Sequence, residues 1–338
     1  MKDTLVIGSG ITGLTTALLL AKRGRNVTLV EKLPHIGGLL HRFSRKGFRF
    51  DTGFHFTGGF DNVMPQMLEY LNMQDVVRPA PLTASFLLAE SSRIFEMPTT
   101  GLDDLEAALS AQFPDFAQAI HRYYAAEKEV IADTPIFDIP NLNRVDVFTQ
   151  FTNYDHLTTN EFMDEIGITS PELRTLLPIF SLCHGTPPAE SPFSYHCRCS
   201  FGMESHLAGV VGGGDAFISG FKRELEKNGA SIRTGVWLER LICSETSPLC
   251  QTAILNTGEA FDVDEIYFTN APGNYIGLFP EKAISPRLRK RITNLKPTVS
   301  FTTVYGVIHS PVPDTHNLTF FLRNNNLDRI LQIGRAHV

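Results

Sequence analysis

Cysteine, tryptophan and excess positive charge are all scarce in this chain of 338 residues. Its 36 acidic residues outnumber 30 Lys and Arg, giving a formal net charge of −6, so a nucleic-acid-binding surface is not expected. No apolar run approaches the roughly 18 residues that cross a bilayer. Five cysteines, without the spacing of a secreted disulfide framework, favour free thiols and a cytoplasmic location.

Two local patterns invite functional readings that we reject. The first residues have Lys2 and an apolar stretch, as a signal peptide does, but Asp3 and three glycines break that pattern. His196 lies beside Cys197 and Cys199, yet no second ligand pair follows at zinc-site spacing, so we predict no metal. Neither pattern identifies the protein's role.

The order of apolar segments indicates an α/β fold with an insertion. A strand, a helix and a second strand are predicted at Thr4–Ile7, Ile11–Arg23 and Asn26–Val30. Two helices near residues 103–112 and 116–131 then follow one another without a strand between them, so they lie outside the parallel sheet. Alternating helix and strand patterns return after Gly214, at 216–228, 231–234, 237–242, 252–255 and 265–269.

A glycine fingerprint, Gly8-x-Gly10-x-x-Gly13, lies between the first strand and the first helix. Gly8 permits a tight turn, and Gly10 lets the backbone approach a pyrophosphate that faces the positive end of the helix. Glu31 ends the second strand, where it can accept both hydroxyls of an adenosine ribose and would repel a 2′-phosphate. The pattern predicts a Rossmann-like dinucleotide-binding unit that disfavours NADP.

The segment after Glu31 favours flavin over nicotinamide. A nicotinamide dehydrogenase would return to a crossover helix here, whereas this chain has a Gly37-Gly38 doublet and then Asp51-x-Gly53-x-His55. Glycine-rich, strand-forming sequence suits a loop along a pyrophosphate and a strand beneath a flat ring. We therefore expect FAD as the cofactor.

The ordered motifs resemble those of the phytoene desaturase, carotenoid isomerase and retinol saturase group of flavoproteins, a branch of the amine-oxidase-like superfamily. The resemblance covers nearly the whole chain, since further segments match in the same order: Gly185-x-Pro187-Pro188, Gly212–Gly214, Gly229-Ala230 and Thr269–Pro272. It implies an α/β, Rossmann-like FAD/NAD(P)-binding fold with an inserted mixed α+β substrate domain.

The resemblance also implies roles for single residues. The ADP half of FAD would be held by Gly8, Ser9, Gly10, Gly13 and Glu31, and Lys32 and Asn270 are further candidate cofactor-binding residues. Gly37, Gly38 and Leu39 would lie along the phosphates and ribityl chain, and Leu238 would offer backbone groups to adenine. Asp51, Gly53 and His55 would lie near the isoalloxazine ring, with His55 as the candidate catalytic residue.

The chain departs from the proteins that it resembles in two ways. Leu39 stands where many of them have arginine after the glycine doublet, with Arg42 as a candidate substitute for its charge. The glycine-rich flavin motif expected near the carboxyl terminus is absent. Residues 334–338, after a predicted strand at Arg329–Ile333, look non-native, so we expect a truncated chain.

We predict two discontinuous lobes: an FAD-binding lobe at 1–80 and 207–300, and a substrate lobe at 81–206 and 301–333 with a strand at Ser300–Ile308. The predicted activity is hydride transfer between flavin and an apolar polyene or isoprenoid, with desaturation, saturation and isomerisation left open. The alternatives are an amine-oxidase-like enzyme, which needs an aromatic cage near the flavin, and a noncatalytic dinucleotide-binding protein. The apolar helix predicted at Pro171–Gly185 either packs in the protein core or has a functional role. In the second case it forms a wall of an apolar substrate tunnel or a patch that dips into a membrane surface.

Overall fold

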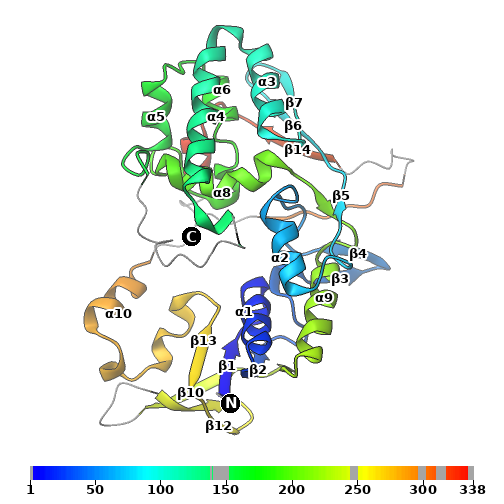
Figure 1. Cartoon of the computed structure of the whole chain (residues 1–338), viewed down its shortest axis with the longest axis vertical. Coiled ribbons are helices and arrows are strands. Elements are labelled where there is room, and N and C mark those ends of the chain that lie inside the picture. Colours follow the sequence, from blue (N-terminus) through cyan, green and yellow to red (C-terminus); the bar gives the residue numbers. More distant parts are fainter. Residues whose placement is uncertain are drawn as a thin grey trace. The chain divides into compact units, whose positions relative to one another are not determined.

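A computed structural model of the chain describes residues 3–137, 139, 152–243, 250–295, 302–309 and 317–333. The chain divides into two compact units (Figure 1). Unit 1 comprises residues 1–55, 68–78 and 210–297, and unit 2 comprises residues 56–67, 79–209 and 298–338. Helix α2 (Val63–Leu71) contributes residues to both.

Unit 1 is built on a parallel sheet with the strand order β13-β1-β2-β9. These strands are β1 (Asp3–Ile7), β2 (Asn26–Glu31), β9 (Ser231–Thr234) and β13 (Glu265–Phe268). Its helices are α1 (Ile11–Lys22), α9 (Gly214–Lys227) and α10 (Pro286–Thr293), with short 3-10 turns η1 (Gly38–Leu40), η6 (Pro272–Asn274), η7 (Ile276–Leu278) and η8 (Glu281–Ala283). Because β1 and β2 are parallel, α1 crosses over between them, as the sequence pattern predicts.

Both faces of this sheet are covered. Helix α1 buries Leu14, Ala17 and Leu18. On the other face, Leu5 and Val30 join a core cluster with the antiparallel strands β10 (Leu238–Cys243), β11 (Cys250–Leu255) and β12 (Ala260–Asp262). A hairpin of β3 (Arg42–Arg45) and β4 (Phe48–Asp51) also belongs to unit 1. Covered faces explain why the sheet strands read as continuous apolar runs.

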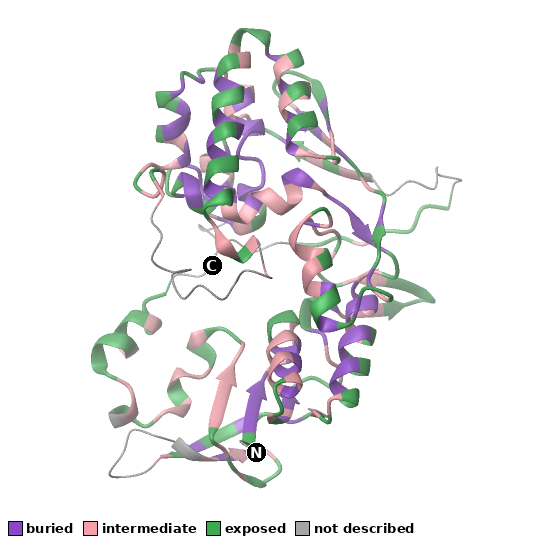
Figure 2. Ribbon diagram, in the orientation of Figure 1, coloured by how far each residue is buried: buried purple, intermediate pink, exposed green. Residues whose placement is uncertain are grey.

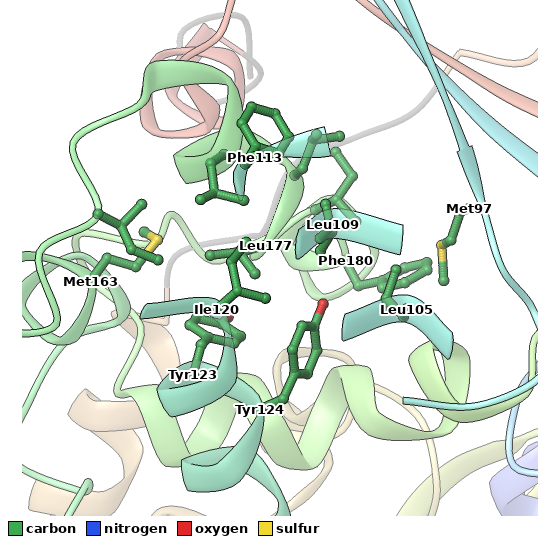
Figure 3. Packing of buried hydrophobic residues seen from close by; sticks show 14 of the residues in the cluster. Met97, Leu105, Leu109, Phe113, Ile120, Tyr123, Tyr124, Met163, Leu177 and Phe180 are labelled. Carbon is green, nitrogen blue, oxygen red and sulfur yellow. The ribbon is translucent and has the colours of Figure 1, made fainter. Parts of the chain in front are cut away.

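Unit 2 combines helices with a sheet of order β14-β6-β7. The strands of unit 2 are β5 (Pro79–Ala80), β6 (Thr83–Leu88), β7 (Arg93–Met97) and β14 (Asn317–Leu322). Strand β8 (Gly209–Val210), which pairs with β5, lies at the boundary of the unit. Its helices are α3 (Leu102–Gln112), η2 (Pro114–Phe116), α4 (Ala117–Ala132), η3 (Pro135–Phe137), α5 (Thr159–Glu165), α6 (Pro171–Leu176), α7 (Ser181–His184), α8 (Phe193–Ser205) and α11 (Leu327–Ile333). Figure 2 shows their buried sides in purple, and Figure 3 shows part of the apolar core between them.

Two predicted elements of unit 2 are wrong. The single helix expected at Pro171–Gly185 is divided into α6 and α7, because Pro178 has no N–H with which to continue a helix. Its apolar residues, Leu173, Leu176, Leu177, Ile179 and Phe180, belong to the unit 2 core. The strand expected at Arg329–Ile333 is helix α11, which begins where the Asn326 side chain accepts the Arg329 N–H at 2.9 Å.

Two further expectations need correction. Residues 302–309 form no strand, and Val304 is 90% exposed. Cys243 is disulfide-bonded, so the expectation of free thiols is wrong there, whereas Cys183, Cys197 and Cys199 are free. Residues 334–338, expected to be non-native, lie outside the described residues. Among the helices described here, none combines the length and apolar composition needed to cross a membrane.

Candidate dinucleotide-binding site

The glycine fingerprint forms a turn between β1 and α1. Gly8 has φ +98°, a conformation that favours glycine, and its N–H donates to the Val30 carbonyl at 2.9 Å. The Leu14 N–H donates to the Gly10 carbonyl at 2.9 Å, which begins the helical bonding. The N–H groups of residues 11–13 therefore have no acceptor within the helix, and the turn presents donors and a positive dipole end to an anion.

The second and third glycines of the fingerprint serve different purposes. A Cβ on Gly13 would lie 1.8 Å from the Gly8 carbonyl oxygen, so glycine is required for close packing of α1 on the turn. A Cβ on Gly10 would meet no protein atom within 4 Å. Space is therefore kept open above Gly10, as expected where a pyrophosphate approaches the backbone.

Glu31, where β2 ends, is bonded to this turn. Its Oε2 accepts the Ser9 N–H at 2.9 Å and the Ser9 hydroxyl at 2.7 Å. Its Oε1 accepts the Leu33 N–H at 2.9 Å. Ser9 itself is fully buried. The acid predicted to bind the ribose is thus held beside the fingerprint by three hydrogen bonds.

The glycine doublet lies against the same turn. The Gly37 N–H donates to the Ser9 carbonyl at 3.0 Å, and a Cβ on Gly38 would lie 3.0 Å from the Gly10 Cα. Gly37 (φ +116°) and Gly38 (φ +54°) are both left-handed, and a Cβ on Gly37 would meet the Ile218 side chain of α9 at 2.4 Å. The fold therefore brings the doublet and the fingerprint together, as the motif order predicts.

The loop after Glu31 also carries two histidines. The rings of His35 and His41 meet edge to face, with centroids 3.5 Å apart. Burial, and then the neighbouring His35, lowers the pKa of His41. With Ile218 and Lys222 of α9 they line a hollow of about 510 Å³. These neighbours therefore favour the neutral form of the His41 ring.

Thr269 contacts the glycine turn in a way that the sequence did not reveal. It follows β13, and its hydroxyl donates to the carbonyls of Ile7 (2.8 Å) and Gly8 (3.2 Å). Its Oγ1 would lie 2.9 Å from a Cβ on Gly13. The family resemblance had singled out this segment, but only the pairing of β13 with β1 shows that Thr269 braces the glycine turn.

The residues expected near a flavin ring are less closely gathered. Arg42 Nε lies 2.8 Å from Asp51 Oδ1. Arg42, the candidate substitute for the arginine that many similar proteins have after the glycine doublet, therefore forms an ion pair with Asp51, a predicted site residue. A Cβ on Gly53 would lie 3.0 Å from the Leu39 side chain, which is 69% exposed. His55 is exposed as well.

The remaining predicted cofactor residues lie at the ends of sheet strands. Lys32 Nζ lies 5.5 Å from the Trp237 ring centroid, a cation–π contact. Leu238 begins β10 opposite Leu255, with its side chain buried. Asn270 is exposed, one residue beyond Thr269. The structure thus brings Gly8, Ser9, Gly10, Gly13, Glu31, Gly37 and Gly38 into contact, with Lys32, Leu39, Asp51, Gly53, His55, Leu238 and Asn270 outside this cluster.

This geometry defines a Rossmann-like dinucleotide-binding domain. A family model described as an NAD(P)-binding Rossmann-like domain matches residues 6–71, which contain the turn, Glu31 and the glycine doublet. Parallel strands around a crossover helix, with the glycine turn where β1 ends, are the structural context that this family requires. The predicted fold class is confirmed.

The chain is similar to two kinds of curated enzyme. It is 24% identical over 328 residues to the all-trans-retinol 13,14-reductase of Rattus norvegicus, covering 90% of this chain and 53% of that protein. It is 25% identical over 280 residues to the 4,4'-diaponeurosporene oxygenase of Staphylococcus aureus, and the match covers 78% of this chain and 55% of that protein. These matches confirm the family resemblance drawn from the motifs. The chain spans about half the length of the curated relatives it matches.

Solved structures share the fold. An oxidoreductase from Methanosarcina mazei has a TM-score of 0.59 at 18% identity, over 87% of this chain and 66% of that chain. A putrescine oxidase variant has a TM-score of 0.55 at 14% identity, over 86% of this chain and 62% of that chain. These TM-scores show a common fold, and at identities this low they do not indicate the substrate of this chain.

Proposed function

We propose that this chain is part of an FAD-dependent oxidoreductase that transfers hydride to or from flavin on an apolar polyene of the retinoid or carotenoid kind. The open space above Gly10, bounded by the unpaired N–H groups at the start of α1, is the observation that carries the cofactor proposal. The names of the retinol reductase and diaponeurosporene oxygenase relatives support the substrate class.

The residues of unit 1 would perform binding and orientation. The turn at Gly8–Gly13 would donate N–H groups to the pyrophosphate, and Glu31 would accept ribose hydroxyls while disfavouring a 2′-phosphate. Gly37, Gly38 and Leu39 would follow the phosphates and ribityl chain, and Asp51, Gly53 and His55 would face the ring. The bound flavin would supply the hydride chemistry itself.

The proposal also assigns cofactor binding and substrate binding to different parts of the chain. The parts of the chain near 1–80 and 207–300 would hold the cofactor, and those near 81–206 and 301–333 would hold a small apolar substrate. An apolar substrate of this kind partitions into membranes, so we include peripheral attachment of a cytoplasmic protein to a membrane surface in the proposal.

The test is an anaerobic reaction of flavin-loaded protein, prepared with any natural continuation of the chain, against retinoids, carotenoids and amines. Loss of the oxidised flavin spectrum with a polyene indicates desaturation, and reoxidation of reduced flavin by a polyene indicates saturation. An altered polyene isomer without net flavin change indicates isomerisation. Flavin bleaching by an amine alone contradicts the polyene proposal and favours an amine oxidase.

A noncatalytic role has one observation in its favour. Among the relatives is a protein of Danio rerio named inactive all-trans-retinol 13,14-reductase, 23% identical over 356 residues, covering 98% of this chain and 58% of that protein. Protein that binds FAD but leaves every polyene and amine unchanged, with oxidised and with reduced flavin, would support that role instead.

A further inference from the structure

One buried face of α8 is polar. His196, Ser200 and Glu204 follow at intervals of four residues and are 1%, 0% and 1% exposed. Residues four apart lie on the same side of a helix, so the three side chains form a single row. The row lies within the unit 2 core, to which Cys197 of the same helix belongs. Polar groups are costly to bury in such a place unless they have partners.

Glu127 of α4 meets the inner end of this row. It is 1% exposed, and contact with Glu204 contributes to the shift of its pKa. Neither carboxyl makes a hydrogen bond of ordinary geometry within the described part of the chain, and the same holds for the fully buried Tyr123 hydroxyl. Figure 3 shows Tyr123 and Tyr124 among apolar side chains of this core. Two carboxyls and a phenol thus share an apolar enclosure.

The charges around the pair do not neutralise it. Burial, and then the Glu204 carboxyl, raises the pKa of Glu127 well above its usual range. Burial raises the pKa of Glu204 to about 7, although contacts with Glu127 and Ser200 offset part of that shift. The titratable or charged groups facing the two carboxyls and their tyrosine neighbours are Tyr123, Tyr124, Cys197, Lys128 and Glu106. Lys128 makes its ion pairs with Asp103 (2.6 Å) and Glu106 (3.6 Å).

The outer part of the row has a defined direction. The Thr186 N–H donates to His184 Nδ1 at 3.2 Å, so a neutral His184 carries its proton on Nε2. That Nε2 lies 3.2 Å from His196 Nδ1, which must therefore accept. The proton of His196 is then on Nε2, 3.5 Å from Ser200 Oγ. The ring N–H donors of both histidines therefore point inward along the row, whereas the Ser200 hydroxyl donates to the His196 carbonyl at 2.9 Å.

The two histidines suit this arrangement because both are neutral at pH 7. Burial lowers the pKa of His184 to about 4. Burial, and then His184, lowers that of His196 to about 3. His184 ends α7 and is only partly buried, and the adjacent Cys183 is exposed. The row therefore runs from near the surface of unit 2 to its fully buried carboxyl pair.

We propose that Glu127 and Glu204 form a proton-binding site holding one shared proton, and that the row of side chains from His184 connects this site to solvent. Two carboxyls in contact share a proton because like charges at that separation cannot both ionise. This proposal does not depend on the cofactor or on the identity of the substrate.

Proton delivery along the row balances at each group. A proton from solvent binds His184 Nδ1, which releases the Thr186 N–H, and the Nε2 proton of His184 passes to His196 Nδ1. The Nε2 proton of His196 then passes to Ser200 Oγ, and the Ser200 hydroxyl breaks its hydrogen bond to the His196 carbonyl, turns to Glu204 and gives its own proton to a Glu204 carboxylate. Each imidazole gains one proton and loses one, so both end in the opposite tautomer.

The shared proton is tested by infrared spectroscopy of the purified chain at neutral pH. We expect a carbonyl band of a protonated, buried carboxyl that disappears in both Glu127→Gln and Glu204→Gln. Glu165→Gln, at an exposed position of α5, is the matched control and should leave the band unchanged. Absence of the band from the wild-type protein, or its persistence in both variants, overturns the proposed site.

The connection to solvent is tested by the rate at which that band shifts after transfer into D₂O. Ser200→Ala should slow the shift by about 100-fold, the lower end of what a positioned acid–base group contributes to proton transfer. Ser194→Ala is the control, since Ser194 is buried on the same helix but bonds to Asp155. Equal rates in wild type and both variants contradict the relay. If Ser200→Ala fails to fold, lowering the pH of wild-type protein until both histidines are protonated should change the rate, and a constant rate contradicts the relay.

Discussion

Glu31 Oε2 accepts two hydrogen bonds from Ser9, one from its N–H at 2.9 Å and one from its hydroxyl at 2.7 Å. The acid that identifies the dinucleotide fold in the sequence therefore also fixes the second residue of the glycine turn. Ser9 in turn accepts the Gly37 N–H on its carbonyl. The carboxylate proposed to recognise the cofactor therefore also fixes the shape of the glycine turn.

Replacement of Glu31 should destabilise the protein even without cofactor. Glu31→Ala removes the acceptor of three hydrogen bonds and leaves a buried serine hydroxyl unpaired, so we expect a loss of about 1–3 kcal/mol in the free energy of unfolding. Ser9→Ala removes one of these bonds and should cost less. Urea unfolding measures both, and equal stability of wild type and Glu31→Ala would contradict the structural role.

Gly13 and Gly10 should respond in opposite ways to alanine. Gly13→Ala places a Cβ 1.8 Å from a backbone oxygen, so we expect a loss of about 3 kcal/mol or more, or failure to fold. Gly10→Ala meets no protein atom and has φ −63°, so its stability should equal that of wild type or exceed it by about 0.5 kcal/mol. Thermal unfolding of the two variants checks this, and similar melting temperatures would refute the packing argument.

The buried His196 should make the protein sensitive to acid. Its pKa is about 3 in the folded chain, against an ordinary 6.5. Between these values the unfolded chain binds a proton that the native chain does not, so stability falls as pH drops from about 6.5 toward 3. His196→Gln should flatten this part of the stability curve. An unchanged slope between pH 6 and about 4 in the variant would show that His196 is not buried as described.

The buried Glu204 should make the protein less stable as the pH rises, the reverse of the effect of His196. Its pKa is about 7 in the folded chain, above the usual range of glutamate, so the native state holds the extra proton. Its contribution is therefore fully present below about pH 4.5 and is lost as pH rises through 7. We expect Glu204→Gln to stabilise the protein more at pH 8 than at pH 5. Chemical unfolding at both pH values decides this, and a larger gain at pH 5 would be the contrary result.

The sequence predicts those parts of the site that depend on local spacing. Gly8, Gly10, Gly13 and Glu31 belong to one βαβ unit, and the strand predicted at residues 231–234 coincides with β9. The segment containing Thr269 was singled out, but its contacts with the glycine turn were not predicted, because they require β13 to pair with β1 across most of the chain. The Glu127–Glu204 pair was missed for the same reason, since nothing local signals that α4 buries one carboxyl against another.

Errors in secondary structure came from side-chain effects that outweigh apolar patterning. Leu327, Ile330 and Leu331 fit a helix once Asn326 caps it, although residues 329–333 also pass for a short strand. Pro178 interrupts a helix that apolar content alone extends to Gly185.

The central claim is that the turn around Gly10 holds FAD, and titration of the purified chain with FAD, followed by quenching of flavin fluorescence, tests it most directly. We predict saturable binding by wild type and weakening by roughly tenfold or more, about 1.4 kcal/mol, in Gly10→Ala at unchanged thermal stability. Equal FAD affinity of wild type and a folded Gly10→Ala would contradict the claim.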